Sequence, residues 1–161
     1  MAHLDCNTPV GRKYIKIEHH VANVVCQWFD CNTLRLGSDS TRSDRIFYRG
    51  DSVVSVAEIK ARELSLDKLR KFGSYLVSES KIIHGCELAK LVHAPFFLFV
   101  YLIQSRQIVW WKIADSNGEK SCNYQVFMSE TKDNCNGGTA VRRNAYINLS
   151  GMNQRLVNPP C

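Results

Sequence analysis

Residues 44–62 read DRIFYRGDSVVSVAEIKAR and contain two strand-like runs joined by a short turn. Both runs are rich in β-branched and aromatic residues, and Gly50-Asp51 between them is typical of a tight hairpin. The second run is apolar on both faces up to Ala57, which favours a central strand. We therefore predict paired antiparallel strands over 44–49 and 52–61.

The hairpin carries two acids and a lysine that its register would bring close together. With the turn centred near Asp51, residues whose numbers sum to about 102 lie opposite each other. Asp44 and Glu58 meet this condition, so we expect their carboxylates to meet across the two strands. Side chains two apart on a strand share a face, so Lys60 is expected beside Glu58. Asp39 and Asp51 are competing acids, but the first precedes the strand and the second lies at the hairpin tip.

Two carboxylates and an ammonium group suit metal-assisted phosphoryl chemistry. Mg²⁺ prefers oxygen ligands, and Asp44, Glu58 and the backbone carbonyl of Ile59 would supply them. A metal ion held in this way stabilises charge on a phosphoryl group and activates a bound water. Lys60 would position that water or help to deprotonate it. We predict Mg²⁺ or Mn²⁺ as the cofactor and phosphodiester hydrolysis as the reaction.

Helical patterns flank the hairpin on both sides. Thr8-Pro9 is a typical helix start, and apolar residues then recur every three or four positions to about residue 30. Ser65 is a second helix start, and Pro95 ends the helical pattern that follows it. Leu66, Leu69, Phe72 and Leu76 form the apolar stripe of that pattern, and we leave open whether residues 65–92 make one helix or two. Further strands are predicted over 34–37, 96–103, 108–113, 124–128 and 145–149.

The order of these elements defines a fold class. A helix, three strands, a helix, two strands and an extension predict an α/β sandwich around a mixed sheet. At 161 residues the chain suits a single domain. We expect a core over 8–114, and a hairpin-bearing extension or a loose tail over 115–161.

Asp44, followed after thirteen residues by Glu58-Ile59-Lys60, resembles the PD-(D/E)XK nuclease superfamily. This superfamily provides the fold of many restriction endonucleases, Holliday-junction resolvases and phage exonucleases. The resemblance covers residues 8–114 and implies a restriction-endonuclease-like core in the order α-β-β-β-α-β. It also implies that Asp44, Glu58 and Lys60 are catalytic. In that family an acid on the first helix often completes the metal site, and Glu18 is the matching residue here.

The charge of the chain favours a polyanionic partner. Lys and Arg number 21 against 15 Asp and Glu, which gives a net charge of +6 at pH 7. A positive surface attracts nucleic acid, and binding through backbone phosphates is strongly salt-sensitive. The charge thus favours a nucleic acid, and the resemblance implies that DNA is the partner. The side chains predicted to contact it are Arg62, Lys68, Lys71, Lys81, Arg142 and Arg143.

The cysteines and apolar runs exclude several other classes. An odd count of seven cysteines, without a secretory signal, favours free thiols in the cytoplasm. The cysteines show no C-x-x-C spacing, which argues against a zinc ribbon. The longest apolar run, 94–103, is far shorter than a membrane span, so no membrane partner is expected.

Three functions therefore remain open. The first is a metal-dependent DNA nuclease in DNA processing, replication or recombination, for which a phage origin would fit by analogy. The second is a catalytically silent nucleic-acid-binding protein on the same fold, and the third is a protein-interaction module. The resemblance also makes a homodimer plausible. Endonuclease or exonuclease action, and DNA or RNA as the substrate, stay undecided.

Overall fold

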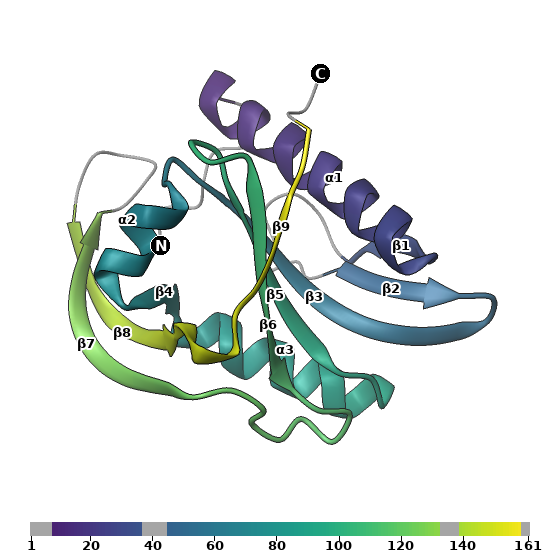
Figure 1. Ribbon diagram of the computed structural model, residues 1–161. Helices are drawn as coiled ribbons and strands as arrows, with labels where there is room; N and C mark the ends of the chain where they lie inside the picture. The colour runs from purple at the N-terminus through teal and green to yellow at the C-terminus, as the bar shows by residue number, and fades with distance from the viewer. Residues whose placement is uncertain (1–7, 37–44, 133–138, 159–161) are drawn as a thin grey trace.

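A computed structural model of the chain describes residues 8–36, 45–132 and 139–158. These residues form two sheets and several helices, arranged as Figure 1 shows. The six-stranded sheet has the order β1-β2-β3-β5-β6-β9 and the three-stranded sheet has the order β4-β8-β7. The helices are α1 (Pro9–Phe29), α2 (Leu66–Phe72), α3 (Glu79–Val92) and the short 3-10 helix η1 (Leu149–Gly151). The strands are β1 (Asn32–Arg35), β2 (Arg45–Arg49), β3 (Ser52–Arg62), β4 (Ser74–Ser78), β5 (Phe96–Leu102), β6 (Gln107–Ala114), β7 (Tyr124–Lys132), β8 (Thr139–Asn148) and β9 (Asn153–Leu156).

The β2–β3 hairpin has the predicted register at the end of the hairpin away from its turn. Arg45 lies opposite Ala57 and Phe47 lies opposite Ser55, so both pairs sum to the expected value, whereas a bulge between Phe47 and Tyr48 shifts the pairs beside the turn by one residue. Gly50 makes the turn with a φ of 56°, a conformation that is easiest for glycine. β3 pairs on its other side with β5 in parallel, and β5 pairs with β6 antiparallel. The sheet is therefore mixed, with β3 in its interior as predicted.

Helix α1 covers one face of the six-stranded sheet. The Thr8 side chain accepts a hydrogen bond from the Gly11 amide at 3.0 Å, and Pro9 occupies the first turn, as predicted. Buried residues of α1, including Ile17 and Val21, pack against the β3 residues Ala57, Ile59 and Ala61. Because side chains alternate along a strand, Glu58 and Lys60 point to the opposite face.

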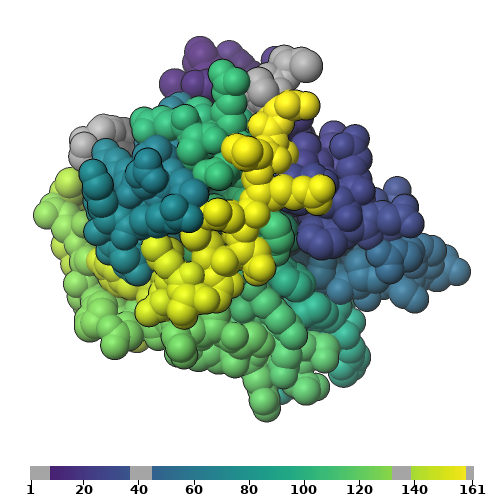
Figure 2. Space-filling model, in the orientation of Figure 1, coloured from purple at the N-terminus to yellow at the C-terminus, as the bar shows by residue number. Residues whose placement is uncertain are grey.

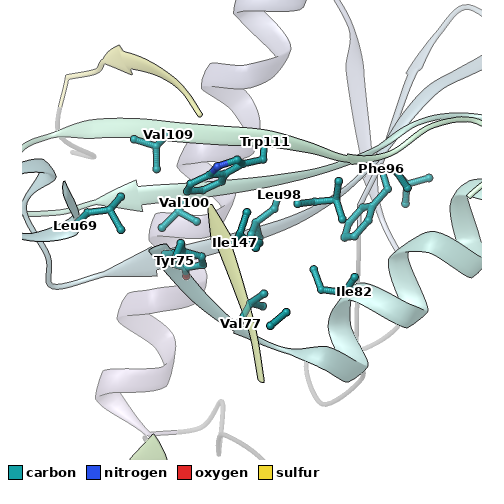
Figure 3. Packing of buried hydrophobic residues seen from close by; sticks show 14 of the residues in the cluster. Leu69, Tyr75, Val77, Ile82, Phe96, Leu98, Val100, Val109, Trp111 and Ile147 are labelled. Carbon is teal, nitrogen blue, oxygen red and sulfur yellow. The ribbon is translucent and has the colours of Figure 1, made fainter. Parts of the chain in front are cut away.

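The second sheet and α3 cover that opposite face (Figure 1). The core between the two sheets includes Trp111 and Tyr75, whose rings stack with centroids 5.6 Å apart (Figure 3). Gly85 brings α3 close to the sheet, because a Cβ atom at this position would overlap the ring of Phe96. This close approach places the first turn of α3, which contains Lys81, over β3.

The segment between Ser65 and Pro95 differs from the predicted helical pattern. It contains two helices separated by the strand β4, so Leu76 lies in a strand rather than on a helical stripe. Gly73 ends α2 in a left-handed conformation with a φ of 72°. The next residues pair with β8, more than sixty positions away in the chain, with Leu76 opposite Tyr146. This long-range pairing overrides the local helical spacing.

The C-terminal region is built into both sheets. β7 and β8 form a hairpin that completes the second sheet, and β9 pairs with β6 at the edge of the first. In Figure 2 the C-terminal segment crosses the surface between α2 and α1. The expected extension over 115–161 therefore contributes core residues, among them Ala145 and Ile147, rather than a loose tail.

Two further expectations concern the cysteines and the membrane. Cys26, Cys31, Cys86 and Cys122, which lie within the described ranges, are free thiols as predicted. No helix among the described residues is both long enough and apolar enough to span a bilayer.

Candidate active site

The central feature of the site is a buried glutamate on β3. Glu58 is 2% exposed, and its Oε1 lies 2.6 Å from the ammonium nitrogen of Lys60. The two residues share a face of the strand, as the alternation of side chains predicts. A buried carboxylate without a countercharge is very unfavourable, so the nearby ammonium group is essential for its ionised form.

A second lysine also neutralises Glu58. The ammonium nitrogen of Lys81, in the first turn of α3, lies 3.1 Å from the same Oε1. The side chains of Lys60 and Lys81 are 23% and 21% exposed, so both are largely buried beside Glu58. One carboxylate thus faces two cations that come from two different elements.

The charges around Lys60 keep it protonated. Burial by itself lowers the pKa of Lys60, but the attraction of Glu58 and Glu18 and the hydrogen bond to Glu58 outweigh this effect. The pKa of Lys60 therefore lies above its ordinary value of 10.5. At neutral pH Lys60 is a cation that can stabilise negative charge, and it is not a free base.

Glu18 reaches the same region from α1, on the other side of the sheet. Burial raises the pKa of Glu18 above its ordinary value of 4.5, the charge of Lys60 opposes this rise, and the charge of Glu58 adds to it. Glu18 therefore lies within electrostatic range of the Glu58–Lys60 pair, and its part in a metal site stays a prediction. The negative charge of Glu58 thus makes ionisation of Glu18 less favourable.

Glu18→Gln is expected to raise the free energy of unfolding at pH 7 in the absence of divalent metal. The folded-state pKa of Glu18 is raised, so ionised Glu18 destabilises the folded state only above its ordinary pKa. The difference between the two proteins should therefore shrink as the pH falls below about 4.5. Urea denaturation at several pH values, with the exposed Glu87→Gln as the control, measures this difference. A Glu18→Gln protein that is less stable at pH 7 would contradict the expectation.

The donor set can be compared with what a divalent metal requires. Glu58 and Glu18 provide carboxylate oxygens, which are the kind of ligand that Mg²⁺ prefers. The described residues contain no cluster of three His, Cys, Asp or Glu side chains suited to hold a metal ion. Asp44, the third predicted acid, lies outside the described residues. In the sequence, Asp44 directly precedes Arg45. Arg45 pairs with Ala57, which is the residue directly before Glu58. The oxygen donors of Glu58 and Glu18 therefore suit a divalent metal in kind, and a complete site would need a further ligand such as the predicted Asp44.

The predicted DNA contacts lie at several places on the surface. Arg62 ends β3, two residues after Lys60, and the exposed Lys68 and Lys71 lie on α2. Arg142 is exposed on β8, whereas Arg143 donates a hydrogen bond to Glu79 Oε1 at 3.0 Å. DNA contacts by these residues, and by Lys81, stay predictions. For Lys81 the structure adds the contact with Glu58.

The sequence patterns did not indicate two contacts near the site. The first is the contact between Lys81 and Glu58, which depends on how α3 packs on β3 and has no local sequence signal. The second is Arg45, a largely buried residue whose Nη2 lies 2.9 Å from Nδ1 of His19. Since a guanidinium group only donates, this nitrogen of His19 accepts the hydrogen bond. For Arg45, the sequence feature that could have indicated a place near the site was its position directly after Asp44.

A six-stranded mixed sheet flanked by helices places the chain in the α/β class. The family described as "Phage putative PDDEXK endonuclease" matches residues 13–124 of the chain, which include most of α1, Glu58 and Lys60. The chain therefore belongs to this phage PD-(D/E)XK endonuclease family, as its sequence resemblance suggested, and the family implies a restriction-endonuclease-like fold. No curated protein and no solved structure matches the chain.

Proposed function

We propose that the protein is a metal-dependent nuclease that hydrolyses phosphodiester bonds of DNA at the Glu58–Lys60 site. The observation that carries the proposal is the buried Glu58 carboxylate, which lies 2.6 Å from one ammonium group and 3.1 Å from another. A surface pair would be explained by solvation alone, but a carboxylate that is 2% exposed needs a partner or a role. Family membership and the net charge of +6 support the same function.

Each residue has a chemical task in this proposal. Glu58, Glu18, Asp44 and the Ile59 carbonyl would hold Mg²⁺ or Mn²⁺ through oxygen atoms. When bound, such an ion activates water and stabilises charge on a phosphoryl group. Lys60, which is protonated at neutral pH, stabilises negative charge on the scissile phosphate. Arg62 and the lysines of α2 bind neighbouring phosphates and orient the strand.

Lys81 has a task that follows from its contact with Glu58. Its ammonium group supplies a second positive charge to a carboxylate that is almost fully buried. This charge keeps Glu58 ionised and oriented before any substrate arrives. Lys81 is therefore a positioning residue in the proposal.

The experiment is a cleavage assay on supercoiled, linear and branched DNA with Mg²⁺ or Mn²⁺. We expect cleavage by the full chain that stops when EDTA is added. Asp44→Asn should lower the rate by about 10²-fold or more, because it removes one of the proposed acids. Asp51→Asn is the matched control, since Asp51 lies at the exposed turn of the same hairpin and should retain full activity.

Each outcome of this assay distinguishes between the three functions. Cleavage by the full chain and by Asp44→Asn at equal rates would overturn the proposed site. Salt-sensitive DNA binding without cleavage, under every metal tested, would favour a catalytically silent nucleic-acid-binding protein. Neither binding nor cleavage would favour a protein-interaction module.

A further inference from the structure

The outer surface of the second sheet carries a set of aromatic and amide side chains that the proposed nuclease site does not use. Leu76, Tyr146 and Gln125 lie opposite one another on β4, β8 and β7, so they share one face. The neighbouring residues Tyr75 and Ala145 point into the core, so this shared face points away from it. We call the surface formed by Phe72, Leu76, Gln125, Phe127 and Tyr146 the aromatic face.

Two grooves make the aromatic face continuous with the end of β3. A groove of about 530 Å³ is lined by Arg62, Phe72 and Leu76, among others. A second groove, of about 570 Å³, is lined by Phe127 and by the amide side chains of Asn123 and Gln125. Ser74 and Tyr146 line both grooves, so the two join. Arg62 is two residues after Lys60 on the same face of β3, which places this path about 7 Å along the strand from the proposed site.

Two phenylalanine side chains of the aromatic face are largely exposed to solvent. Phe72 is 62% exposed and Phe127 is 54% exposed. The Phe127 ring meets the Tyr146 ring edge-on, with centroids 5.7 Å apart. Exposed aromatic rings interspersed with amide side chains match what unpaired bases require, because rings stack on bases and amides hydrogen-bond to their edges.

The charges along the grooves favour an anionic ligand. Arg62 lies at one end, and at the other the Lys120 ammonium nitrogen lies 4.1 Å from the centre of the Tyr124 ring. The only acid that lines either groove, among the described residues, is Glu63, which pairs with Lys13 at 3.5 Å. A second copy of this chain would bring the same positive charges to the surface, whereas a nucleic acid strand complements them.

We infer that the aromatic face binds a single-stranded segment of DNA and leads it past Arg62 to the Glu58–Lys60 site. This inference rests on the proposed function and names its substrate class: DNA with a single-stranded arm. A duplex is excluded from this mode, because its bases stack on each other and do not present their faces to protein rings. The two cations along the path are also few for a surface that would bind a duplex through phosphates alone.

The test is fluorescence anisotropy with a labelled oligothymidine of about 16 nucleotides, measured in EDTA so that cleavage plays no part. Phe127→Ala and Phe72→Ala should each raise the dissociation constant for the single strand by about 5- to 100-fold. Binding of a duplex of the same length should change less than about twofold. Phe29→Ala is the matched control, because Phe29 is 45% exposed on α1, away from the aromatic face, and should bind like the unchanged chain.

The outcomes separate this inference from the proposed function. Equal single-strand binding by Phe127→Ala, Phe72→Ala and Phe29→Ala would overturn the inference, even if the protein cleaves DNA. Selective loss in the first two variants would support the face, even if no metal produces cleavage. Conversion of a dimer into a monomer by Phe127→Ala, seen by sedimentation, would show a self-association surface and overturn the inference.

Discussion

Glu58→Gln is expected to lower the rate of DNA cleavage by at least about 10³-fold. The substitution keeps the size and shape of the side chain but removes the charge that attracts Lys60 and Lys81 and that would bind the metal. The rate with saturating Mg²⁺ on a linear substrate measures the effect. Because Glu58 is 2% exposed, its loss cannot be compensated by a solvent ion in the same position.

The same substitution should also lower the free energy of unfolding, by on the order of 3 kcal/mol. It leaves two ammonium groups near each other without the carboxylate that neutralises them. Thermal denaturation therefore has to accompany the rate measurement, and cleavage is assayed well below the lower melting temperature. Glu87→Gln is the control, since Glu87 is an exposed acid on α3 that lines neither groove. Wild-type cleavage by a folded Glu58→Gln protein would contradict the proposed role of Glu58.

The part of the site that could be predicted depends on patterns within short stretches of sequence, namely the alternation of side chains on a strand and the apolar spacing of a helix. The alternation of side chains on β3 puts Glu58 and Lys60 together, and this follows from the sequence alone. The two-residue turn at Gly50-Asp51 sets the pairs next to it, whereas the pair of Arg45 with Ala57 also depends on a bulge between Phe47 and Tyr48, which the sequence does not indicate. The helix that carries Glu18 was also predicted, because its apolar spacing agrees with its burial in the structure.

The parts that were not predicted depend on distant contacts. Residues 74–78 have an apolar spacing compatible with a helix, and only pairing with β8 makes them a strand. The same pairing builds the aromatic face, because it brings Leu76 opposite Tyr146. The contact between Lys81 and Glu58 likewise depends on the close packing of α3 at Gly85. None of these contacts leaves a signal within one local stretch of sequence.

Lys60→Met should lower the cleavage rate by about 10²- to 10⁴-fold, if Lys60 acts on the reacting phosphate. Lys81→Met is the matched comparison, because both lysines contact the same Glu58 oxygen atom but only Lys60 is proposed to contact the phosphate. We therefore expect the loss with saturating Mg²⁺ to be much larger in Lys60→Met. Equal losses in the two variants would mean that neutralisation of Glu58, rather than contact with the phosphate, is what the lysines provide.

The pH dependence of stability gives an independent measure of the same lysine. The pKa of Lys60 is raised in the folded state, so its stabilising contribution is complete below the ordinary lysine pKa of 10.5 and is lost as the pH rises through the higher folded-state pKa. Urea denaturation of the unchanged chain should therefore show a loss of stability above about pH 10.5 that is smaller in Lys60→Met. An identical alkaline loss in both proteins would mean that Glu58 and Glu18 do not raise the pKa of Lys60 in the folded state, and that the pair of Lys60 with Glu58 does not stabilise the fold.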